Sequence, residues 1–330
     1  MSVGKPARWS PLKVTVQVLG FAIGLTLFAW CVSVALRPRN RESLDRLLDA
    51  PLWVLSSLLG CAVLSLLLNG SLFWFLIRTV RSIGWRSVVA VNSVATCLNY
   101  LPFKLSVVAR FVIHNRRDNL PVTLILAWLA AAGVVILGAI AAPIAATFWR
   151  GRVDAVWVVV TTAGLLVTGG SVVVMARFLR RAAPGSFISK VLSFRPVAPL
   201  TPAIVMLADG GAIAASFAVR TIDLACVAAR FWLAAHACGT PIGMSTAVLA
   251  ASTYFLIGVV TPAGALGARE GGTTLLAGSV LHLPDVGNES FAVVTLVASA
   301  SEMIVNLVAA AISGLWLRFS RPKSEKGTEN

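Results

Sequence analysis

Long apolar stretches are the feature that most restricts what this chain can fold into. A helix needs about 20 predominantly apolar residues to cross the hydrocarbon core of a bilayer. The composition, with 58% hydrophobic and 12% charged residues, also argues against a soluble globular domain. Runs long enough to cross occupy residues 13–36, 52–77, 120–148, 153–175 and 291–317. We therefore predict an integral membrane protein.

These runs are expected to be helices. Lipid offers no hydrogen-bond partner to bare peptide groups, and the runs lack the alternation of barrel strands. A signal peptide is the alternative for residues 13–36, which follow basic residues. That run is about twice the usual length of a signal-peptide core and has no small-x-small cleavage site before Arg37. The fold class is therefore predicted to be an all-α polytopic membrane protein, with about six full spans.

Basic residues alternate between the connecting segments and predict the topology. Five segments together hold 19 Lys or Arg: 1–13, 78–86, 104–118, 177–195 and 318–330. The three segments that alternate with them hold 6: 37–49, 150–154 and 282–289. Cytoplasmic loops carry the excess of Lys and Arg, so both termini are expected in the cytoplasm of a multi-pass cell membrane protein, inner or plasma. The formal net charge of +15 then favours anionic headgroups at the membrane rim, and no nucleic acid partner is expected.

Two apolar segments do not fit full crossings. Residues 88–113 have basic segments on both flanks and are broken by "LNYLPFKLS", which predicts a re-entrant hairpin from the cytoplasmic side. Residues 203–238 read either as one span preceded by a surface or half-length helix, or as two short spans; the charge rule favours one crossing. Residues 243–281 then have both flanks outside and become a second re-entrant hairpin, entering from the opposite face.

The expected organisation is one integral membrane domain, residues 1–330. Broken hydrophobic segments in both halves of a chain are typical of an inverted-repeat transporter with its site near the midplane, although no repeat is visible residue by residue. The predicted parts are a tail at 1–12, a first half at 13–176 with the hairpin 88–113, a basic linker at 177–202, a second half at 203–317 with the hairpin 243–281, and a tail at 318–330.

The stretch "TPAGALGARE" interrupts the second hairpin. Pro262 removes a backbone donor, and Gly264 and Gly267 permit the conformations of a turn, so the helix should break there. Non-helical backbone at membrane depth requires protein cover or water, which implies a cavity. The helix that resumes after Gly267 would offer free N–H groups, and with Arg269 it would bind a phosphate or carboxylate. Glu270 could pair with an arginine, cap peptide groups, or titrate; an interfacial pair that only fixes the hairpin is the alternative.

Further candidates carry charge in apolar surroundings. Asn99, Pro102, Lys104 and Arg110 lie at or after the first break, and the two cations could contact substrate or extend to the headgroups. In the last span, Glu302 and Asn306 share a helix face because they are four residues apart. We expect Glu302 to pair with a cation such as Arg230 or Arg269, for a structural or coupling role, and Asp223 is a further ion-pair candidate.

At "TPAGALGARE" and "LNYLPFKLSVVARFVIHNRR" the sequence resembles the lysylphosphatidylglycerol synthase transmembrane-region family, a flippase-like family. The late signature retains Gly264, Gly267, Arg269 and Glu270, and alanine replaces a usual proline and one usual glycine. The early segment retains Leu98, Asn99, Pro102 and Arg110, with Leu105 or Ser106 where glycine is common.

The resemblance implies a membrane domain that handles lipid. In bifunctional members such a domain moves aminoacylated phospholipid across the bilayer after a separate soluble domain has made it. The last predicted span ends close to Asn330, so we expect no synthase domain on this chain and do not carry lysyl transfer over.

The leading hypothesis is a transporter, a flippase of an anionic phospholipid or polyprenyl-linked lipid headgroup. An integral-membrane lipid-modifying enzyme is less favoured, because His114, His236 and His282 are scattered and no paired-carboxylate or metal-spaced cluster is visible. A non-transporting accessory subunit of cell-envelope assembly is a third hypothesis. No catalytic residue, metal or cofactor is predicted, and a separate synthase or glycosyltransferase is an expected partner. The sequence does not specify the lipid, the direction or coupling of transport, or the oligomeric state.

Overall fold

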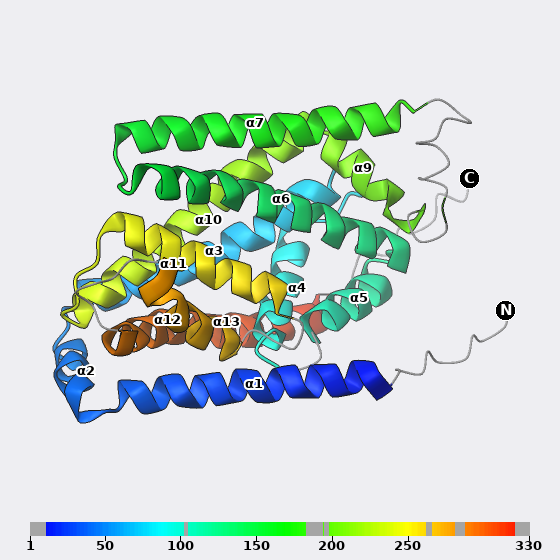
Figure 1. Ribbon diagram of the computed structural model, residues 1–330. Coiled ribbons are helices and arrows are strands. Elements are labelled where there is room, and N and C mark those ends of the chain that lie inside the picture. The colour runs from blue at the N-terminus through cyan, green and yellow to red at the C-terminus, as the bar shows by residue number, and fades with distance from the viewer. Residues whose placement is uncertain are drawn as a thin grey trace.

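The computed structural model describes residues 11–101, 105–182, 194, 198–261, 266–280 and 288–320. Every regular element in these ranges is helical, as the sequence predicted. Figure 1 shows most of the long helices running side by side in one bundle. The α-helices are α1 (Pro11–Ala35), α2 (Arg41–Leu48), α3 (Leu52–Ile77), α4 (Trp85–Leu98), α5 (Leu105–Arg117), α6 (Val122–Arg150), α7 (Ala155–Arg180), α9 (Thr201–Ala208), α10 (Gly210–Ala237), α11 (Met244–Val260), α12 (Ala268–Val280) and α13 (Asn288–Phe319), with 3-10 turns η1 (Pro38–Asn40) and η2 (Ala198–Leu200).

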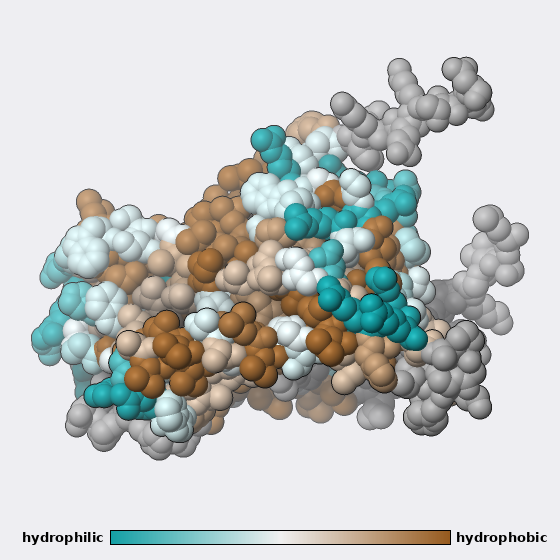
Figure 2. Space-filling model, turned by 90° about the horizontal axis from the view of Figure 1, so that it is seen from above, coloured by the Kyte–Doolittle hydropathy of each residue, from teal (hydrophilic) through white to brown (hydrophobic). Residues whose placement is uncertain are grey.

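Six of these helices are long and apolar enough to cross a membrane. They are α1, α3, α6, α7, α10 and α13, and the shortest candidate span, Thr15–Ala35, has 21 residues. Figure 2 shows hydrophobic side chains over the middle of one face of the bundle, with hydrophilic ones gathered toward its two ends. The length and composition of these helices confirm a multi-pass membrane protein. Which end faces the cytoplasm stays a prediction.

The segment at 203–238 forms the end of a short helix and one long helix. The short helix α9 ends at Ala208, and α10 runs without interruption from Gly210 to Ala237. Asp209 separates them: its side chain accepts a hydrogen bond from the N–H of Ala212 at 2.9 Å and caps α10. Of the two alternatives left open by the sequence, these helices match one long candidate span preceded by a short helix, and the crossing itself stays a prediction.

Both interrupted segments are pairs of short helices. In the first, α4 packs against α5; in the second, α11 packs against α12. The two pairs lie toward opposite ends of the bundle in Figure 1. At one end, Arg117 of α5 donates a hydrogen bond to the carbonyl of Leu317 in α13 at 3.0 Å. At the other, the turn before α11 lies against α2, where a Cβ on Gly239 would stand 2.2 Å from Nη1 of Arg46.

Helix α13 lies between the two pairs. It packs against α4 of the first pair and α12 of the second, and also against α1, α3 and α10. Small residues permit such close contacts in a bilayer; Gly70 of α3, for example, packs against Val89 of α4. Buried aromatic rings fill the space between α10, α11 and α13, where Phe231 contacts Tyr254 and Phe291. The last helix is thus the element that both broken pairs share.

Candidate functional site

A stripe of polar residues runs along one face of α13. Ser299, Glu302 and Asn306 are separated by three and four residues, so they fall on the same side of the helix. Each of them binds a side chain from a different segment of the chain. We call these three residues and their partners the α13 polar stripe. Polar groups inside a membrane protein are costly unless they are paired, which makes this stripe the first candidate for function.

Glu302 lies between two arginines. Nη2 of Arg230, in α10, donates to Oε2 of Glu302 at 2.8 Å, and Nη1 of Arg269, in α12, donates to Oε1 at 3.3 Å. The side chain of Arg230 is 1% exposed, whereas those of Arg269 and Glu302 are 14% and 16% exposed. The sequence proposed either arginine as the partner of Glu302, and the structure places both against it. Of the two arginines, Arg269 is therefore the more accessible.

The two guanidinium groups have spare hydrogen-bond donors. Among the described residues, Nε and Nη1 of Arg230 and Nε of Arg269 have no hydrogen-bond partner. Glu302 contacts both guanidinium groups, and the carboxylates of Glu270 and Asp223 also act on them from further away. Buried donors without an acceptor are costly, and a guanidinium plane matches the oxygens of a carboxylate or phosphate. The arrangement is suited to binding a further anion.

Glu270 is fully buried, and both of its carboxylate oxygens accept hydrogen bonds from the chain itself. Its Oε2 accepts the N–H of Gly267 at 2.6 Å, and its Oε1 accepts a hydrogen bond from the hydroxyl of Ser299. A glutamate three residues into a helix that binds the N-cap N–H is one half of a capping box. Of the roles considered for Glu270, the capping role matches this geometry. A carboxylate of the chain itself therefore occupies the start of α12, where the sequence predicted a bound phosphate or carboxylate.

Both tyrosines of the chain lie on the polar stripe. The guanidinium carbon of Arg269 stands 5.0 Å from the ring centroid of Tyr254, and the hydroxyl of Tyr254 donates to Ser299 at 3.2 Å. Nδ2 of Asn306 donates to the hydroxyl of Tyr100 at 2.8 Å. Tyr100 follows α4 and Tyr254 belongs to α11, so each broken pair contributes one tyrosine. Sequence reasoning missed both tyrosines, although tyrosine within an apolar segment was a usable signal.

Glycine makes room for Arg269. A Cβ on Gly258, in α11, would stand 2.2 Å from Nε of Arg269, so the side chain crosses α11 at a position where a larger residue would displace it. Gly258 and Ser299 were also missed by sequence reasoning. Ser299 was recoverable, because it lies three residues before Glu302 on the same helix face.

Asp223 forms a separate buried pair. Its carboxylate accepts from Nη1 of Arg220 at 2.5 Å and from the hydroxyl of Ser65 at 2.5 Å. The guanidinium of Arg220 also lies over the ring of Phe255, 3.8 Å from its centroid. Because it joins α3, α10 and α11, this pair reads as a structural link between helices.

The candidate residues of the first hairpin that the structure describes, Asn99 and Arg110, make hydrogen bonds and a ring contact outside the α13 polar stripe. Asn99 accepts a hydrogen bond from Ser106 at 3.3 Å, which ties α4 to α5 across the break. Arg110 donates to Asn92 at 2.6 Å and lies 4.6 Å from the ring centroid of Phe73, so its contacts are within the first half of the chain. Pro102, Lys104, Pro262 and Gly264 lie outside the described residues. In the described part of the chain, no three His, Cys, Asp or Glu side chains gather as metal ligands.

The comparison with known families agrees with this architecture. The sequence model of the lysylphosphatidylglycerol synthase TM region matches residues 17–310. The chain belongs to this family. The match covers all six candidate spans in whole or large part and includes Arg230, Arg269 and Glu302. Searches among curated proteins and among solved structures gave no match. Membership of the lysylphosphatidylglycerol synthase TM family relates this membrane protein to lipid handling.

Proposed function

We propose that this chain is a transporter that moves a lipid with an anionic, phosphate-bearing headgroup between the leaflets. The observation that carries the proposal is the pair Arg230 and Arg269 around Glu302, with guanidinium donors left over. Family membership supports a lipid as the substrate class. The phosphate could belong to a phospholipid or to a polyprenyl-linked lipid, and the chemistry that recognises it is the same.

The headgroup would bind by displacing Glu302 from Arg269. The contact between Arg269 and Glu302 is the longer of the two, at 3.3 Å, and both side chains are partly accessible. A phosphate could therefore take the donors of Arg269 while Glu302 keeps its contact with the buried Arg230. The acyl tails would stay in the bilayer, so only the polar headgroup needs a path through the protein.

The two broken pairs offer a way to alternate access. Both pairs contact α13, and they lie toward opposite ends of the bundle (Figure 1). Movement of α11 and α12 would open the stripe toward one face, and movement of α4 and α5 would open it toward the other. Alternating access by rocking of paired elements around a fixed site is the usual scheme in transporters with broken helices.

Reconstitution into liposomes tests this proposal. Purified protein is placed in phosphatidylcholine vesicles that hold a trace of phosphatidylglycerol, phosphatidylcholine or polyprenyl phosphate with a fluorescent label on the hydrocarbon chain, with and without a proton gradient. An impermeant quencher then reports movement between leaflets. We expect transport of at least one anionic lipid, and a loss of about tenfold or more for Arg269→Gln, because a charge-assisted hydrogen bond is removed.

Arg152→Gln is the matched control. Arg152 is an exposed arginine in the turn between α6 and α7, so its removal should leave transport unchanged. Equal transport by wild type and Arg269→Gln would contradict the proposal. A chemically altered lipid recovered without translocation would favour an enzyme, and neither transport nor product across the lipid panel would favour an accessory subunit.

A further inference from the structure

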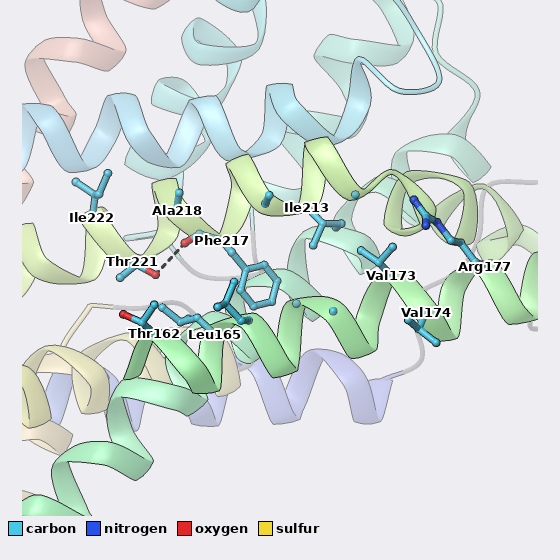
Figure 3. Close-up of a pocket in the computed structure, with 15 residues that line it drawn as sticks. Thr162, Leu165, Val173, Val174, Arg177, Ile213, Phe217, Ala218, Thr221 and Ile222 are labelled. Carbon is cyan, nitrogen blue, oxygen red and sulfur yellow. Dashed lines mark hydrogen bonds between the residues drawn. The ribbon is translucent and has the colours of Figure 1, made fainter. Parts of the chain in front are cut away.

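A long apolar groove lies between α7 and α10, away from the polar stripe. Its volume is about 710 Å³, and Figure 3 shows side chains of both helices facing it. The residues from Thr162 to Arg177 line it along α7; at about 1.5 Å per residue they span about 22 Å. One leaflet contributes about 15 Å of hydrocarbon, half of the thickness of a bilayer core. The groove is therefore long enough to hold a lipid acyl chain.

Small residues create the groove. Gly169 and Gly170 on α7 and Ala214 and Ala218 on α10 leave the space between the helices unfilled. Phe217 fills part of it and stops close to α7, where a Cβ on Gly169 would lie 3.6 Å from its ring. A Cβ on Gly170 would meet no atom within 4 Å. The groove can therefore be filled by substitution without disturbing a packed contact.

One end of the groove carries positive charge. Arg177 lines this end and is exposed; its Nε donates to the carbonyl of Ala208 at 3.1 Å, which fixes the guanidinium beside the start of α10 (Figure 3). Arg180 and Arg181 follow within one turn and are also exposed. At the other end the polar side chains are the hydroxyls of Thr162 and Thr221, and that of Thr221 donates to the carbonyl of Phe217. The groove is thus amphipathic along its length, with its cationic end at the basic rim of the bundle.

We propose that this groove binds an anionic phospholipid, with one acyl chain between α7 and α10 and the phosphate on Arg177. The occupant must be apolar over most of its length and anionic at one end, which is the chemistry of such a lipid. A second copy of the chain fits less well, because it would bring like charges of this rim together or bury Arg177 without a partner. The proposal is separate from the polar stripe and does not require transport.

Photo-crosslinking tests the groove. The full-length protein in nanodiscs receives phosphatidylglycerol or phosphatidylcholine bearing a diazirine on one acyl chain, and labelled peptides are located by mass spectrometry. We expect labelling of α7 and α10 peptides to be about fivefold stronger with phosphatidylglycerol, since a cation near the membrane surface contributes about 1 kcal/mol toward an anionic lipid. Arg177→Gln should abolish this preference and Arg177→Lys should retain it.

Two matched controls complete the experiment. Gly170→Leu should reduce labelling of α7 and α10 several-fold by filling the groove, whereas Gly60→Leu, at an exposed and equally open position of α3, should not. Arg180→Gln removes a neighbouring cation that does not line the groove and should have the smaller effect. Equal labelling by the two lipids would show an unselective lipid-filled crevice and overturn the proposal. The absence of lipid adducts on α7 and α10 peptides would also overturn it.

Discussion

The position of the Arg269 side chain on the polar stripe depends on two uncharged neighbours, Gly258 and Tyr254. Arg269 reaches Glu302 by passing over Gly258 and along the ring of Tyr254. The sequence identified Arg269 and Glu302 because ionisable residues are rare in apolar segments. It could not identify Gly258, because a glycine that makes room for a side chain eleven residues later looks like any other small residue of a membrane helix.

Replacing Gly258 by alanine should displace Arg269 without unfolding the protein. The new Cβ would stand 2.2 Å from Nε of Arg269, which belongs to a flexible side chain that can move away. We expect binding of short-chain phosphatidylglycerol to weaken about tenfold while the melting temperature stays close to that of wild type. Gly60→Ala, with open space around its Cβ, is the control. Unchanged affinity in the Gly258→Ala protein would show that Arg269 does not need this position.

Among the helices, the break between α11 and α12 was the most predictable feature. The proline and glycines after Val260 indicated an interruption, and α11 ends at Val260 while α12 begins at Ala268. What the sequence left open was how α12 begins. Gly267 has a φ of +79°, its N–H is capped by Glu270, and its α-carbon packs against Gly24 of α1. That contact joins residues more than 240 positions apart, which periodicity and turn signals do not reach.

Gly267→Ala should therefore destabilise the whole bundle. A side chain at positive φ is strained by about 1–2 kcal/mol, and the new Cβ would lie 1.8 Å from the carbonyl oxygen of Gly24, which is backbone. We expect a free energy of unfolding lower by at least about 2 kcal/mol, measured by thermal unfolding in detergent. Gly314→Ala in α13, where the Cβ meets nothing within 4 Å, should leave stability unchanged. Equal stability of the two variants would contradict the close approach of α1 to α12.

For the whole molecule, charge alternation and helix length were enough to predict six spans and two broken pairs. Both ends of each candidate span lie within a few residues of the ends of the predicted segment, with one exception. The span in α10 starts later than predicted, because α9 is a separate short helix. The groove between α7 and α10 was not predicted, since it depends on which faces of two helices oppose each other. Both broken pairs meet at α13, so one helix face collects the polar residues of both halves.

The central claim is that Arg269 binds an anionic headgroup in competition with Glu302, which keeps its contact with the buried Arg230. Titration calorimetry of dihexanoyl phosphatidylglycerol against the purified protein, Arg269→Gln and Glu302→Gln tests it most directly. We predict effects of opposite sign: Arg269→Gln weakens binding about tenfold, because a donor is lost, and Glu302→Gln tightens binding, because the competing carboxylate is neutralised. If both substitutions weaken binding, or neither changes it, the three residues form a structural ion-pair cluster and the proposed site is contradicted.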